Sequence, residues 1–218
     1  MKNIEIEYQG KENMLNEIFE KKILQNGMTY KGYTKSIIEE VGNTKPEILN
    51  EHDLELFEYK KLNIQRSARI EKIYDVSDEL KSEIQNIKDK QIWMVITEAW
   101  CGDSAQNLPY IAKMASLNFN IELKIILRDS NLDVMDLYLT NGARSIPKLV
   151  ALDENGNELF TWGPRPKAAQ DLMKQWKDEG IVKPELYEKL HLWYGRNRGR
   201  EIESEFLKII SMMNQVQV

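Results

Sequence analysis

Cysteine is nearly absent from this sequence, because Cys101 is the only one in 218 residues. One thiol can form neither an internal disulfide nor a Cys-x-x-Cys metal site, so a disulfide framework is excluded and a reducing compartment is favoured. No apolar run approaches the roughly 18 residues of a membrane span. The N-terminus alternates charged and apolar residues and lacks the hydrophobic region of a secretory signal. We therefore expect a cytoplasmic protein.

An excess of basic residues is missing as well. The formal net charge is −5, whereas binding to nucleic acid or to an anionic membrane would need a net basic face. We expect neither of these partners, and a protein or a low-molecular-weight thiol or disulfide suits the sequence better. The sequence indicates no cofactor and no metal site, and it leaves the oligomeric state open.

What is present is organised around residues 100–104, Trp-Cys-Gly-Asp-Ser. The apolar segment 92–96 before them is short enough to be a buried strand, and apolar residues recur at helical spacing after them. Cys101 is therefore predicted to lie in a strand-to-helix turn. Unpaired backbone N–H groups and the positive end of the helix dipole favour the thiolate at such a position.

Periodicity and turn signals predict the element order β-α-β-α-β-β-α around this turn. The strands are expected at 92–96, 121–127, 148–152 and 158–162, with the first two parallel. Asn155 and Gly156 are expected to supply the two positive φ angles of a tight hairpin between the last two strands. The helices are expected after Cys101, over 131–139 and after Pro166.

Residues 1–88 are predicted to form a helical extension. Apolar stripes mark helices that end near Gly27 and Gly42, a third runs from about 51 to 73, and Ser77 is suited to N-cap a fourth; the first stripe consists of Leu15, Ile18 and Phe19. Two more helical patterns follow Gly180. The predicted organisation is thus a helical extension over 1–88, an α/β unit over 89–180, and C-terminal helices over 181–218 packed on that core.

Several residues together resemble the thioredoxin superfamily: Trp100-Cys101-Gly102, Pro109 eight residues after the cysteine, and the later Ile146-Pro147. The form W-C-G-D followed by Ser is similar to a group of bacterial thioredoxin-like proteins. The resemblance covers about residues 90–178 and implies a thioredoxin-like three-layer core. It also implies that Pro147 is cis, and that a substrate binds against Trp100, Gly102, Ile146 and Pro147.

Ser104 stands where thioredoxins carry their second cysteine, so the motif is C-x-x-S. A serine hydroxyl cannot resolve a mixed disulfide on Cys101, and an external thiol would have to do so. Ser104 could instead hydrogen-bond the thiolate or help to satisfy the helix N-terminus. The motif therefore predicts a monothiol mechanism with Cys101 as the nucleophile.

Asp103 acts against the helix dipole. A carboxylate about 6 to 8 Å from the sulfur, at an effective dielectric of about 20, opposes ionisation by about 2 kcal/mol, whereas the dipole contributes about 0.3 to 1 kcal/mol. A cation is needed to offset Asp103. Arg144 is the best candidate, because the Ile-Pro loop faces the cysteine in the fold that this sequence resembles.

Three other ionisable residues receive structural interpretations. The buried aspartate of thioredoxins is replaced by Val95, which is consistent with the absence of a second thiol. Glu98 could be a substitute acid, but a solvated glutamate at the strand end is the preferred interpretation. His52 and His191 are isolated in helical patterns, and we expect both to be structural.

Three functions remain open. The first is a thiol-disulfide oxidoreductase, which predicts an accessible Cys101 with a pKa below about 7.5. The second is a non-catalytic thioredoxin-fold module that binds peptides or proteins. The third is an iron–sulfur site shared with an external thiol, as in monothiol glutaredoxins, which Asp103 disfavours because it adds negative charge. A small buried hydrophobe is the structural alternative for Cys101.

Overall fold

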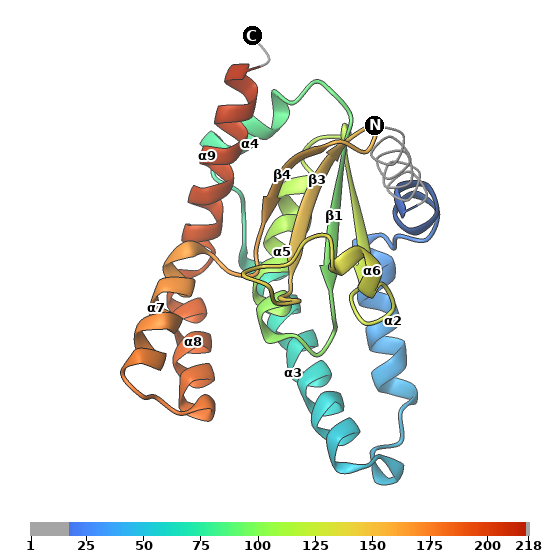
Figure 1. Cartoon of the computed structure of the whole chain (residues 1–218), viewed down its shortest axis with the longest axis vertical. Helices are drawn as coiled ribbons and strands as arrows, with labels where there is room; N and C mark the ends of the chain where they lie inside the picture. Colours follow the sequence, from blue (N-terminus) through green and yellow to red (C-terminus); the bar gives the residue numbers. More distant parts are fainter. Residues whose placement is uncertain (1–17, 217–218) are drawn as a thin grey trace, which may run out of the picture.

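A four-stranded sheet forms the centre of the computed structural model, which describes residues 18–216 (Figure 1). The strand order is β2-β1-β3-β4; β1 and β2 run parallel, whereas β3 is antiparallel to both β1 and β4. All of β1 is buried, as expected for a central strand with both faces covered. The predicted strands are confirmed, as β1 (Gln91–Thr97), β2 (Ile121–Leu127), β3 (Lys148–Asp153) and β4 (Glu158–Trp162).

The hairpin between β3 and β4 differs from the expected turn. Gly156 has a φ of 83°, but Asn155 does not have a positive φ, so the expectation of two left-handed residues is wrong. Asp153 explains the difference, because its Oδ1 accepts the backbone N–H groups of Asn155 and Asn157, both at 2.8 Å. The side chain holds the loop in a shape that needs only one left-handed residue.

Two helices connect the strands on opposite faces of the sheet. α5 (Gly102–Ala115) links β1 to β2, and α6 (Leu132–Met135) follows β2. α6 is shorter than the predicted 131–139, because the N–H groups of Leu137 and Tyr138 bond to carbonyls only three residues back, which tightens and ends the helix. The chain then turns at Gly142, as the sequence indicated.

Between residue 18 and the first strand the chain is mainly helical, in agreement with the prediction for this part. Thr29, Asn50 and Ser77 each accept a backbone N–H at a helix start, which satisfies an otherwise unpaired donor. Leu15, part of the first predicted stripe, lies outside the described residues. The elements are the π-helical turn η1 (Ile18–Gln25), α2 (Tyr30–Asn43), the short η2 (Pro46–Ile48), α3 (Glu51–Ile73) and α4 (Asp78–Gln85).

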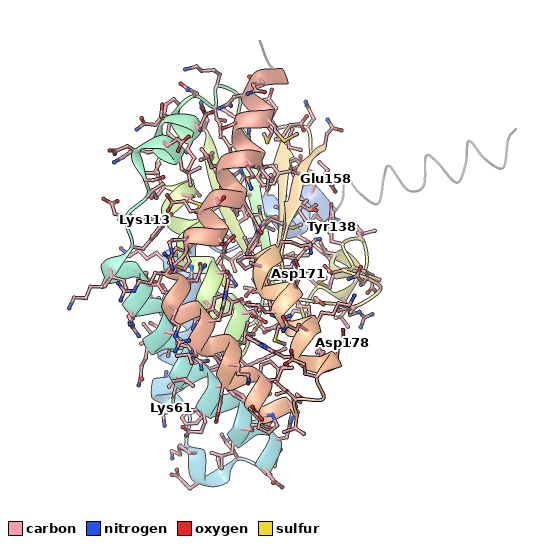
Figure 2. The ribbon with its side chains drawn as sticks, turned by 90° about the vertical axis from the view of Figure 1, so that its left-hand side faces the viewer. Lys61, Lys113, Tyr138, Glu158, Asp171 and Asp178 are labelled. Carbon is pink, nitrogen blue, oxygen red and sulfur yellow. The ribbon has the colours of Figure 1, made fainter. Side chains whose placement is uncertain are left out.

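Three helices end the chain: α7 (Lys167–Asp178), α8 (Lys183–Asn197) and α9 (Arg200–Val216). The inward residues of α7, Ala169 and Met173, are buried, but they pack with α8 in a small separate core. It is α9 that lies over the sheet (Figure 2). Its residue Phe206 packs against Trp93, with the ring centroids 5.6 Å apart. The hydrophobic spacing within α7 and α9 does not indicate which of these two helices packs on the sheet.

Two apolar cores lie on the two faces of the sheet. One combines Trp93 and Val95 of β1 with residues of α4, α5 and α9. The other combines Met94 and Ile96 with residues of η1 and α6, and it also contains Cys101 and Ile146. The end of β1 therefore leads directly from a packed core into the Trp-Cys-Gly turn.

Figure 1 shows α3 and the α7–α8 pair extending past the same end of the sheet, the end at which β1 leads into α5. Residues of α3 and α8 line a common cleft there together with the α5 N-terminus. Among the described residues, no helix has the length and apolar character that crossing a membrane requires.

Candidate functional site

Cys101 is the N-cap residue of α5, at the strand-to-helix turn that the sequence predicted. Its Sγ donates a hydrogen bond to the carbonyl oxygen of Ile146 at 3.4 Å, and the Ile146–Pro147 peptide bond is cis. The cysteine is only 8% exposed. The expectation of an accessible thiol is therefore wrong for this structure, because packing against the second apolar core covers most of the side chain.

The Cys101 thiol is also not activated, because its pKa is well above neutral pH. The pKa of Cys101 is raised to about 11, mainly by burial and next by the Asp103 carboxylate, and Ser104 and backbone N–H groups of the helix start only partly offset these effects. This contradicts the pKa below about 7.5 that an efficient oxidoreductase would need. At neutral pH the thiol is protonated, in agreement with its role as donor to Ile146.

Asp103 is buried and fully engaged by a polar network. Its Oδ2 lies 2.5 Å from an Nη2 of Arg165, and its Oδ1 accepts a hydrogen bond of 2.8 Å from the Tyr194 hydroxyl. Asn107 donates to that hydroxyl at 3.0 Å. The sequence analysis therefore predicted correctly that an arginine offsets the charge of Asp103, but it chose the wrong arginine. Arg144, the expected partner, is exposed and pairs with Asp136 instead.

Ser104 faces away from the main cleft. It is 2% exposed and lines a small cavity of about 140 Å³ between α2, α3 and α5. Within residues 18–216, its hydroxyl has no hydrogen-bond partner while the thiol is protonated. Its side chain and backbone N–H favour the thiolate, so the hydroxyl is available to stabilise that form.

A cleft of about 1010 Å³ opens at Cys101. Two of the predicted site residues, the catalytic candidate Ser104 and the binding candidate Pro147, are missing from its lining because both are buried behind it. A second cis proline, Pro164, contributes to the wall. The Trp100 ring lies under the Arg128 guanidinium, 4.8 Å from its centre. The predicted residues that do line the cleft are Trp100, Cys101, Gly102, Asp103, Arg144 and Ile146.

Residues from α3 and α8 that the sequence analysis missed complete the cleft. A Cβ on Gly102 would lie 2.9 Å from Cε1 of His191 and 3.5 Å from Nη1 of Arg66, so glycine allows these side chains to approach the turn. Burial, Arg66 and Arg165 together lower the pKa of His191 to about 4, so its imidazole is neutral. No local signal marks Arg66 or His191, whereas Pro164-Arg165-Pro166 was visible as a stiff turn carrying a cation.

Two further interpretations need correction. Glu98 is 9% exposed rather than solvated, and its Oε1 accepts the Asp129 N–H at 2.8 Å. Burial raises its pKa. His191 lies in the cleft wall, whereas His52 is exposed on α3. Among the described residues, no three His, Cys, Asp or Glu side chains are grouped as metal ligands.

A mixed sheet of this order, with a cysteine at the start of the first crossover helix opposite an X-cis-Pro loop, defines the class of thioredoxin-fold proteins. The sequence profile of the thioredoxin family matches residues 50–177, and the chain belongs to this family. No curated protein matches the chain.

Some solved structures are similar to this chain. A protein of unknown function from Pseudomonas aeruginosa is 21% identical, with a TM-score of 0.50 over 85% of this chain and 99% of that one. An HIV epitope scaffold is 22% identical, with a TM-score of 0.47 over 84% and 98%. The NTD_N/C domain of alkylhydroperoxide reductase from Enterococcus faecalis is 26% identical over 37% and 38%, with a TM-score of 0.33.

Proposed function

We propose that this thioredoxin-fold protein binds an extended peptide segment in the cleft beside Ile146, and that binding does not require a covalent bond to Cys101. The backbone of Ile146 carries this proposal. Ile146 lines the cleft, and within residues 18–216 its N–H has no hydrogen-bond partner while its carbonyl accepts only the weak S–H donor. An extended chain can pair with such a segment by strand addition.

The size and the lining of the cleft support this function. About 1010 Å³ is at the upper end of typical ligand sites, which occupy about 300 to 1,000 Å³. Tyr59 and Tyr187 stand partly exposed on opposite walls, from α3 and α8. Tyrosine provides apolar contact area together with a polar end, which suits reversible binding.

Amide exchange tests this proposal directly. A library of synthetic peptides is screened against the Cys101→Ala variant, and the peptides that bind are added to uniformly labelled protein. We expect the Ile146 amide to exchange more slowly with solvent when a peptide is bound, because it gains an acceptor. Binding without protection of Ile146 would contradict the mode, and no binding at all would contradict the function.

A monothiol oxidoreductase is the second candidate, and the Ser104 hydroxyl specifically favours it. Among residues 18–216, that hydroxyl has no hydrogen-bond partner, and it favours the thiolate. The Cys101 thiolate would attack a disulfide R–S–S–R′ to form a mixed disulfide with R and release R′ as a thiolate. An external thiol would then attack Cys101–S–S–R, regenerate the Cys101 thiol and leave with R as a new disulfide.

Mass spectrometry after acid trapping separates the two candidates. An oxidoreductase should carry substrate thiols on Cys101, since no second cysteine can release them internally. Ser104→Ala should then slow adduct formation, because the thiolate loses a hydrogen bond. If the Cys101 thiol stays unmodified while peptides bind, the result supports the peptide-binding function and contradicts the oxidoreductase.

A further inference from the structure

Arg66 is a half-buried cation that lines the cleft, and none of the carboxylates in the described part of the chain forms an ion pair with it. It projects from α3, and its Nη1 lies 3.5 Å from the position of a Cβ on Gly102, next to Cys101. Within residues 18–216, its only hydrogen bond is from Nη1 to Asn63 Oδ1 at 2.9 Å. A guanidinium has five N–H donors, so most of its donor capacity is unused.

Burial lowers the pKa of Arg66, and Tyr59 and Asp103 act against this at longer range, but within residues 18–216 no carboxylate forms an ion pair with Arg66. Both oxygens of Asp103 are engaged, by Arg165 and by Tyr194. Glu55 and Glu188 also line the cleft, but both are exposed, and neither forms an ion pair with Arg66 in the described part of the chain. Leaving a partly desolvated charge without a counterion is unfavourable.

We infer that Arg66 forms an anion subsite beside Cys101, which binds a carboxylate carried by the ligand of this cleft. This inference deepens the binding function proposed above. A carboxylate matches the planar fork of a guanidinium, because two parallel N–H donors reach its two oxygens. Arg66 lies on α3, which precedes the first strand of the sheet and falls within the part of the chain that the family profile matches.

The neutral form of His191 indicates a positive electrostatic potential beside Gly102. Its ring lies against Gly102, and both Arg66 and Arg165 help burial to keep it neutral. The groups that act on or contact His191 are Arg66 from α3, Gln106 from α5, Arg165 from the loop before α7, and Tyr194 from α8. Asp103 is bound to two of them, Arg165 and Tyr194. The single negative charge of Asp103 does not neutralise both positive charges, those of Arg66 and Arg165.

Nuclear magnetic resonance of the two histidines tests the subsite without any thiol chemistry. Glutarate, inorganic phosphate and neutral glutaramide are titrated into the Cys101→Ala variant at constant ionic strength. We expect glutarate to raise the pKa of His191, because it neutralises Arg66, and glutaramide to have no effect. The exposed His52 is the internal control, and its pKa should stay constant. Phosphate acting as strongly as glutarate would overturn the assignment to a carboxylate.

Three variants locate the effect. Arg66→Gln should abolish the response of His191 to glutarate. Arg66→Lys keeps the charge but loses the fork, so the starting pKa of His191 should stay near that of the parent while glutarate binds less tightly. Arg69→Gln is the matched control, since Arg69 is exposed on the same helix and does not line the cleft. An unchanged response in Arg66→Gln would overturn the inference.

Reaction with an anionic and a neutral disulfide tests whether the carboxylate binds next to Cys101. The protein with Cys101 intact reacts with dithiodipropionate, which is anionic, and with bis(2-hydroxyethyl) disulfide, which is neutral. Each reaction forms a mixed disulfide on Cys101 and releases one thiolate. The rate of each reaction is divided by the rate of the same reaction with the protein unfolded in denaturant. We expect the folded protein to favour the anionic reagent by about tenfold, as for a hydrogen bond to a charged group, and Arg66→Gln to lose this preference.

The outcomes of the two proposals are distinguishable. A glutarate response of His191 without peptide binding would retain the anion subsite and contradict the peptide-binding function. Peptide binding with protection of Ile146, but with no preference for acidic peptides and no glutarate response, would retain the function and overturn the subsite.

Discussion

Asp103→Asn is the substitution that most directly tests why the pKa of the Cys101 thiol is raised. Burial accounts for most of its elevated pKa of about 11, and the Asp103 carboxylate is the next cause. Asparagine has the same shape and can still accept the hydrogen bond from Tyr194, but it has no charge.

The expected magnitude follows from Coulomb's law. Two charges about 7 Å apart at an effective dielectric of about 20 interact by about 2 kcal/mol, and a change of one in pKa corresponds to about 1.4 kcal/mol. The Arg165 guanidinium, 2.5 Å from the carboxylate, is present in both proteins, so its own attraction for the thiolate does not enter the difference. We therefore expect Asp103→Asn to lower the thiol pKa by about 1.

Alkylation by iodoacetamide across the pH range measures this change, and the single cysteine makes the signal unambiguous. Well below its pKa, the thiolate fraction changes tenfold for each pH unit, so Asp103→Asn should be alkylated about tenfold faster at about pH 8. Asp171→Asn is the control, because Asp171 lies exposed on α7 (Figure 2). An unchanged or slower rate in Asp103→Asn would refute the electrostatic account, as would a wild-type pKa below about 8.5.

Three further predictions concern stability, measured by urea unfolding. Tyr194→Phe removes a buried hydrogen bond to Asp103 and should cost about 1 to 3 kcal/mol. Gly199→Ala should cost more than about 2 kcal/mol, because φ is 83° and the new methyl group would lie 2.2 Å from the Tyr110 ring. The pKa of His191 is lowered to about 4, so its stabilising contribution is present above about pH 6.5 and is lost as the pH falls toward 4. Between about pH 7 and 5, the wild type should lose about 1 kcal/mol more than His191→Gln, a value discounted for partial exposure.

Controls in the same assay isolate each cause. Gly180→Ala has a similar φ of 79° but open space around it, so it should show only the backbone cost of about 1 to 2 kcal/mol. Equal losses in Gly180→Ala and Gly199→Ala would contradict the clash with Tyr110. A parallel pH dependence in wild type and His191→Gln would show that other groups cause the acid sensitivity. An unchanged stability of Tyr194→Phe would mean that its hydrogen bond contributes nothing.

Local chemistry made much of the fold predictable. Alternating and continuous apolar patterns located all four strands, and Ser77 was recognisable as a helix cap because a cap depends only on residues within one turn. The cysteine turn was predictable for the same reason, since a buried strand and a helical stripe flank it. The hairpin at Gly156 was located correctly but given the wrong turn, because the Asp153 side chain replaces part of the backbone geometry.

Contacts between distant segments decided the rest. The sequence by itself determined that one thiol stands at the start of α5 with no second cysteine to assist it. Only the tertiary structure decided that this thiol is covered, that Arg165 rather than Arg144 neutralises Asp103, and that α3 and α8 bring Arg66 and His191 to the cleft. The physical reason is range: backbone conformation follows from neighbouring residues, whereas burial and electrostatic potential sum over every group that the fold brings within several ångströms.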